Sequence, residues 1–172
     1  MNSLVVMGVA GSGKSSLARA IAGATGLPLV EGDDFHSESS RARMRAALPL
    51  TDADRDGWLD ALAGELARHP QGVVLACSAL ARRYRERLRA ASPGLRFVFL
   101  DLDEATAYDR VASRGAAHLF PPALVADQFA TLESPMAEAG VLRLDATRPL
   151  EALRDETLCW WGGTPSLQDR GA

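Results

Sequence analysis

The chain has 172 residues, 47% of them hydrophobic and 24% charged, which is typical of a globular protein with a full core. Its formal net charge of −3 argues against nonspecific nucleic-acid binding, which requires a basic surface. Two cysteines make no disulfide framework, and no apolar run approaches the roughly 18 residues of a membrane span. We therefore expect a cytoplasmic protein with no nucleic-acid or membrane partner.

Short apolar runs alternate with helical patterns from one end of the chain to the other. This alternation is typical of an α/β fold with a mainly parallel five-stranded sheet. The last eleven residues, 162–172, are expected to form a flexible tail. The expected strands are 3–8, 27–33, 72–78, 96–102 and 141–146, and the expected helices are 14–25, 37–48, 104–114, 123–133 and 149–161, with one more capped by Thr51 and one with Leu80, Tyr84 and Leu88 on a single stripe.

Polar turns follow the first three strands. The sequences are GVAGSG at 8–13, GDDFH at 32–36 and CSAL at 77–80. Folds of this class bind ligands at the carboxyl ends of their parallel strands. We therefore expect these three turns to meet at one edge of the sheet. Cys77, in the third turn, is expected to be a small core residue rather than a nucleophile.

Residues 8–16 satisfy the pattern GxxxxGK[ST], a phosphate-binding loop that here lies between a predicted strand and a predicted helix. Its glycines let backbone N–H groups curl around phosphate oxygens, and the helix N-terminus adds a favourable dipole. Lys14 is the only lysine among 19 basic residues, as expected if a compact ammonium is needed between the β- and γ-phosphates. The predicted ATP contacts in this loop are Gly8, Ala10, Gly11, Ser12, Gly13, Lys14, Ser15 and Ser16, with the Ser15 hydroxyl on Mg²⁺.

An acidic pair follows the second predicted strand. Phosphoryl transfer needs a carboxylate that receives the proton of the acceptor hydroxyl. Asp33 or Asp34 could serve, and Asp33 stands closer to the strand. A capping or turn role for these aspartates stays open at this point.

Five motifs, in this order and spacing, resemble those of the bacterial gluconokinase family, small P-loop kinases that phosphorylate gluconate at its 6-hydroxyl. The resemblance runs from about residue 4 to residue 155. It implies one kinase domain over 1–161, a three-layer α/β/α fold with a short helical lid at about 112–124, ATP and Mg²⁺ as cofactors, and a homodimer. The motifs are GVAGSGKSS, GDDFH, RARMRAALPLTDADRDGWL, CSALARRYRERLR and HLFPPALVADQFATLESP.

The resemblance also implies roles for individual residues. Asp33 becomes the catalytic carboxylate and a second Mg²⁺ neighbour beside Ser15. Lys14 and the lid residues Arg110 and Arg114 would stabilise the transferring phosphoryl group. The turn at 146–149 would lie beside the adenine. Arg55 suits the carboxylate of a sugar acid, because a guanidinium can donate two parallel hydrogen bonds to a carboxylate. The implied substrate contacts are Asp33, His36, Arg55, Ser78, Arg82, His118 and Gln128.

Two other functions remain open at this stage. One is a related small kinase that acts on another sugar acid or on a shikimate-like acceptor, and the other is a nucleotide-binding module without turnover. Arg82 and Arg85 are expected on the polar side of their helix. The chain departs from the family pattern at Ser37, Ser40, Gly57 and Ala81, and it carries one extra residue in the lid before His118.

Overall fold

The computed structural model describes residues 2–114 and 120–162, so His118 and the predicted tail from residue 163 onward lie outside the described residues. Five strands form one sheet in the order β2-β3-β1-β4-β5, and every neighbouring pair is parallel. The expectation of a mainly parallel sheet is confirmed. The strands are β1 (Leu4–Met7), β2 (Leu29–Glu31), β3 (Val74–Ala76), β4 (Arg96–Asp101) and β5 (Val141–Asp145).

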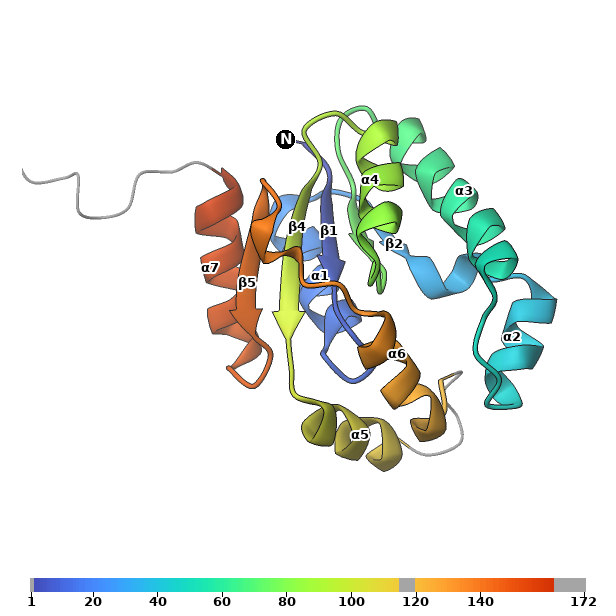
Figure 1. The fold of residues 1–172 in the computed structure, drawn as a ribbon. Coiled ribbons are helices and arrows are strands. Elements are labelled where there is room, and N and C mark those ends of the chain that lie inside the picture. The colour runs from blue at the N-terminus through green and yellow to red at the C-terminus, as the bar shows by residue number, and fades with distance from the viewer. Residues whose placement is uncertain (1, 115–119, 163–172) are drawn as a thin grey trace, which may run out of the picture.

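Helices cover both faces of this sheet, because alternate strand residues point to opposite sides and most of those in β1, β3 and β4 are buried. One apolar cluster joins the sheet to α1 and α7, and the other joins it to α3 and α4. Figure 1 shows α3 and α4 side by side on their face. The result is the expected three-layer α/β/α fold. The helices are α1 (Lys14–Thr25), α2 (Glu38–Arg45), α3 (Asp52–Arg68), α4 (Arg82–Ala91), α5 (Glu104–Ser113), α6 (Val125–Thr131) and α7 (Leu150–Gly162).

The end of β2 differs from the prediction. The strand stops at Glu31, and a 3-10 helix, η1 (Gly32–Phe35), carries the next four residues. A Cβ on Gly32 would lie 2.7 Å from the carbonyl oxygen of Ala76, so the chain can pass β3 this closely only without a side chain. Asp33 therefore projects from a tight turn beside β3 rather than from a continuing strand.

Shorter elements complete the carboxyl edge of the sheet. The 3-10 helix η2 (Pro122–Leu124) leads into α6, which is shorter than predicted, and η3 (Pro135–Ala137) was not predicted. Both 3-10 helices begin at a proline, whose missing N–H is tolerated at the first position of a helix. Within the described ranges, no helix combines the length and the apolar character needed to cross a membrane.

Candidate active site

The phosphate-binding loop connects β1 to α1 in a shape that depends on its glycines. Gly13 has φ 95°, ψ 18° and precedes α1, whose N-terminus receives no side-chain cap. A Cβ on Gly8 would lie 2.8 Å from the carbonyl oxygen of Leu100. The hydroxyl of Ser12 is buried and has no hydrogen-bond partner among the described residues. Uncapped amides at the N-terminus of a helix fit a phosphate group.

Lys14 extends along this loop. Its ammonium donates a hydrogen bond to the carbonyl oxygen of Val9 over 2.9 Å. Burial lowers the pKa of Lys14 from its ordinary value, although the neighbouring Asp33 carboxylate opposes the shift. A bound phosphate would add negative charge beside the ammonium and restore its preference for the charged form. Lys14 and Asp33 thus lie close enough to act on the same transferring group.

The proposed magnesium position contains an acidic residue that the sequence reasoning missed. Ser15, which was predicted to bind Mg²⁺, donates its hydroxyl hydrogen to Glu31 over 2.8 Å. The other carboxylate oxygen of Glu31 accepts no hydrogen bond from a described residue, and it lies 3.5 Å from the guanidinium of Arg19. Hydroxyl and carboxylate oxygens are suitable ligands for Mg²⁺. The arrangement fits the cation, with Glu31 rather than Asp33 in direct contact with Ser15.

His36 and Trp58 form one wall of the acceptor side. Their rings stack with centroids 4.9 Å apart and an interplanar angle of 9°, and the indole N–H donates to the carbonyl oxygen of Gly32 over 2.7 Å. Burial lowers the pKa of His36, which favours the neutral ring, while Asp33 acts in the opposite direction. Its Nδ1 is buried and has no partner among the described residues, and its Nε2 lies 4.0 Å from Asp33. His36 lines the cavity beside the candidate base, where an imidazole suits a sugar hydroxyl.

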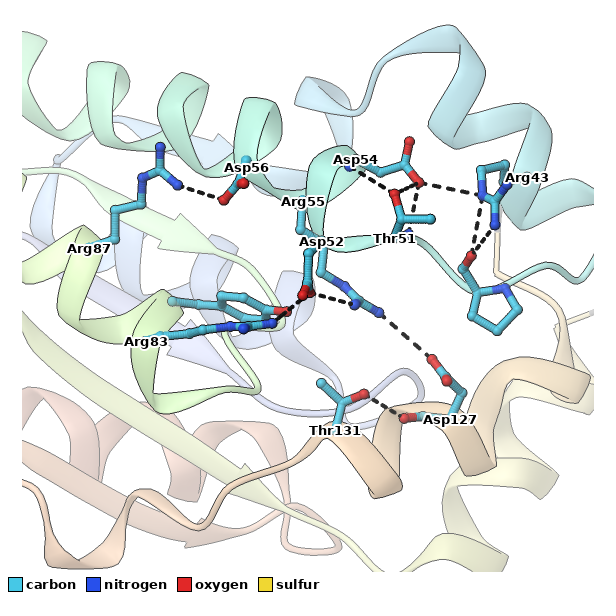
Figure 2. Close-up of polar contacts among 12 residues, drawn as sticks. Arg43, Thr51, Asp52, Asp54, Arg55, Asp56, Arg83, Arg87, Asp127 and Thr131 are labelled. Carbon is cyan, nitrogen blue, oxygen red and sulfur yellow. Dashed lines mark hydrogen bonds and ion pairs between the residues drawn. The ribbon is translucent and has the colours of Figure 1, made fainter.

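Arg55 reaches the same cavity from the first turn of α3. That helix begins with a capping box in which Thr51 and Asp54 bond each other's backbone N–H groups, as Figure 2 shows. The predicted Thr51 cap is therefore confirmed. The Arg55 guanidinium lies 3.8 Å from Asp52 and 3.8 Å from Asp127, and it donates no hydrogen bond to any described residue. Its donors are available for a carboxylate.

Helix α6 connects the acceptor side to the phosphate-binding loop. Gln128 accepts a hydrogen bond from the backbone N–H of Ala10 over 2.6 Å, so this predicted substrate contact also touches the loop. Its neighbour Asp127 faces Arg55 on α3. Two adjacent residues of one short helix thus contact the two halves of the cavity.

The two arginines predicted to act on the phosphoryl group have different surroundings. Arg114 lines the cavity, and its positive charge contributes to the lowered pKa of Lys14. Arg110 instead donates hydrogen bonds to the carbonyl oxygens of Gly11 and Ala146, over 3.3 and 3.1 Å. It holds the turn after β5, the predicted adenine neighbour, against the phosphate-binding loop.

One cavity collects most of the predicted residues. Four predicted residues, Gly8, Ser12, Arg82 and Arg110, do not line it. The cavity also has a partly apolar wall of residues that were not predicted as contacts, among them Met44, Leu80, Tyr84, Phe120 and Leu124. The predicted residues that line it are Ala10, Gly11, Gly13, Lys14, Ser15, Ser16, Asp33, His36, Arg55, Ser78, Arg114 and Gln128.

The two arginines predicted on the polar side of α4 differ: the prediction holds for Arg82 and is wrong for Arg85. Arg82 is exposed and pairs with Glu86 over 2.9 Å, outside the cavity. Arg85, expected on the polar side, is completely buried. Its guanidinium donates to the carbonyl oxygens of Ala79 and Leu80 and to the Glu138 carboxylate, which compensates the buried charge. Arg85 thereby holds the turn that presents Ser78 to the cavity.

Two of the departures from the family pattern have local structural roles. Ser37 caps the N-terminus of α2 by accepting a hydrogen bond from the backbone N–H of Ser40 over 3.1 Å. Ala81 stands where α4 begins and offers no side-chain cap. The carboxylate of Glu133 supplies that cap by accepting from the backbone N–H of Arg82.

Comparisons with known proteins agree with this site. A protein-family model described as an AAA domain matches residues 4–135. A gluconokinase of Gluconobacter oxydans is 38% identical over 90% of this chain and 88% of its own, and the thermosensitive gluconokinase of Escherichia coli is 34% identical over 96% of both. The crystal structure of a gluconokinase from Sinorhizobium meliloti superposes with a TM-score of 0.85 at 42% identity, covering 94% of this chain and 92% of that one. The chain belongs to the gluconokinase family of P-loop kinases.

Proposed function

We propose that this chain transfers the γ-phosphoryl group of ATP to the 6-hydroxyl of D-gluconate, giving 6-phospho-D-gluconate and ADP. The observation that carries the proposal is the single cavity lined by Lys14 and Ser15 at one end and by Asp33, His36 and Arg55 at the other. Relatives named gluconokinases that cover most of the chain support the choice of acceptor.

On the nucleotide side, the N–H groups at the start of α1 and the Lys14 ammonium hold the phosphates. Ser15 and Glu31 would hold Mg²⁺, which supplies charge neutralisation on the phosphate oxygens. Arg114, which also lines the cavity, stabilises the charge on the group being transferred. These residues bring the phosphoryl group to the acceptor without becoming covalently attached to it.

On the acceptor side, Asp33 orients the 6-hydroxyl and receives its proton as the oxygen attacks phosphorus. His36 hydrogen-bonds a hydroxyl of the sugar acid from the cavity wall beside Asp33. Arg55 binds the C1 carboxylate, because its donors face the cavity and no described residue accepts from them. The separation of Arg55 and Asp33 then selects an acceptor that has a carboxylate at one end of its carbon chain and a primary alcohol at the other.

A coupled assay of ADP release tests this function directly. With ATP and Mg²⁺ held constant, D-gluconate should stimulate ADP release well above buffer, while shikimate and the neutral polyol sorbitol should not. Equal stimulation by shikimate would favour the related kinase with another acceptor, and no stimulation by any acceptor would favour a binding module. A homodimer, which the family resemblance implies, and a cytoplasmic location, which the composition predicts, both stay predictions.

A further inference from the structure

Asp127 faces the side chain that the proposed function assigns to the acceptor carboxylate. One of its carboxylate oxygens lies 3.8 Å from the Arg55 guanidinium, and the side chain is 38% exposed. No hydrogen bond from a described residue reaches this carboxylate. Figure 2 shows the pair spanning the space between α6 and α3. The carboxylate of Asp127 is thus near the position of a bound acceptor anion.

The second carboxylate beside Arg55 is different. Asp52 also lies 3.8 Å from the guanidinium, but it accepts a hydrogen bond from Arg83 of α4. Its charge is therefore already partly balanced by a cation outside the cavity. Asp127 has Arg55 as its one cationic neighbour within the described ranges. Asp127 is therefore the carboxylate that Arg55 alone, among the described cations, balances.

We infer that Asp127 is a specificity-determining residue, an internal carboxylate that competes with the carboxylate of the acceptor for Arg55. This inference rests on the proposed role of Arg55 in acceptor binding. With Asp127 present, Arg55 is partly neutralised when no anion is bound, and the cavity discriminates less between charged and neutral polyols. An acceptor carboxylate must displace or share this interaction, and that requirement weakens its binding.

Substitution Asp127→Asn keeps the size of the side chain and removes its charge. The variant should lower both the KM and the calorimetric Kd for D-gluconate by about 3- to 5-fold, the range expected for a partly exposed ion pair. Binding of sorbitol, which has the same hydroxyl chain without the carboxylate, should not tighten. The matched control is Asp56→Asn on α3. This substitution removes the same charge, but Asp56 pairs with Arg87 outside the cavity. That control should leave the gluconate KM unchanged.

The substitution Arg55→Met separates this inference from the proposed function. It should raise the gluconate KM, and Asp127→Asn should have no further effect in the Arg55→Met background. Arg55→Lys keeps a cation if the methionine variant fails to fold. An unchanged KM in the Arg55 variants would overturn the proposed carboxylate site and the inference with it. If the Arg55 variants lose affinity but Asp127→Asn leaves the KM unchanged or raises it, the inference alone is wrong, and a raised KM would mean that Asp127 binds acceptor hydroxyls.

Discussion

The two ends of the cavity are built in different ways. The nucleotide end is one continuous loop, residues 8–16, whose backbone N–H groups and single lysine would bind the phosphates. The acceptor end is assembled from side chains of η1, α3, the turn after β3, and α6, which are far apart in the sequence. The first end depends on backbone shape, so a small steric change can abolish it. The second depends on a balance of charges and hydrogen bonds, so single substitutions should tune it.

The balance of charge also differs between the two ends. Lys14 and Arg55 are both partly buried. The pKa of Lys14 is lowered because desolvation outweighs the attraction of Asp33, whereas Arg55 lies between two carboxylates. A bound phosphate at the first end supplies a missing negative charge, whereas an acceptor carboxylate at the second end competes with charges already present. Affinity for nucleotide should therefore be more sensitive to loss of the protein cation than affinity for acceptor.

The largest effect is expected at the nucleotide end, from Lys14→Arg. A planar guanidinium on a longer stem does not fit the position that the ammonium occupies within hydrogen-bond distance of Val9. Turnover should fall by about 10³-fold, as for the loss of a preorganised charge in a transition state. Steady-state ADP release measures it, and Arg154→Lys on α7 serves as a control away from the cavity. Full turnover in Lys14→Arg would mean that the two ends do not differ as described.

A steric change at the acceptor end should have an intermediate effect. In Gly32→Ala the new Cβ would meet the carbonyl oxygen of Ala76 at 2.7 Å and the Cβ of Cys77 at 2.8 Å. We expect a loss of about 1–3 kcal/mol in the free energy of unfolding, and lower turnover because the adjoining Asp33 is displaced. Urea unfolding and the ADP assay measure the two effects.

Gly57→Ala is the matched control for this substitution. Gly57 lies in α3, is exposed, and has open space around the position of a Cβ. The same exchange should there stabilise the protein by about 0.5–1 kcal/mol, since alanine is a better helix former. Similar destabilisation in both variants would contradict the tight passage of η1 beside β3.

The smallest effect is expected from the protonation of His36. Its pKa in the folded protein is lowered from 6.5, chiefly by burial. Just below that pH, the unfolded chain therefore binds a proton at His36 while the folded protein does not. The free energy of unfolding should therefore fall as the pH drops below about 6.5, and this loss should be smaller in His36→Gln. Chemical unfolding of both proteins at about pH 7.5 and about pH 5.5 measures the difference. An identical pH dependence would exclude a buried neutral His36.

The sequence predicted the nucleotide end better than the acceptor end for a physical reason. The phosphate-binding loop is contiguous, so its spacing alone defines which N–H groups and side chains meet. Glu31 and Asp127 were missed because their importance depends on where β2 and α6 pack against other elements. The α/β alternation and the Thr51 cap were predictable because they follow from local periodicity and hydrogen bonding.

Arg85 shows the limit of amphipathic patterns. On α4 it was placed with the solvated arginines, because five of the eight residues from 82 to 89 are basic. Its burial depends on Glu138, which lies 53 residues later in the chain and accepts its hydrogen bonds. The hydrogen bonds from Arg85 to the turn before α4 could therefore be found only from the folded structure.

The central claim is that Asp33 directs the acceptor hydroxyl at a phosphoryl group held by Lys14, within one cavity. Its most direct test is Asp33→Asn, assayed for gluconate-dependent ADP release and for ATP affinity at saturating Mg²⁺. We expect turnover to fall by about 10²-fold or more while ATP affinity stays nearly normal, because only the proton acceptor is lost. Normal turnover in this variant would contradict the account.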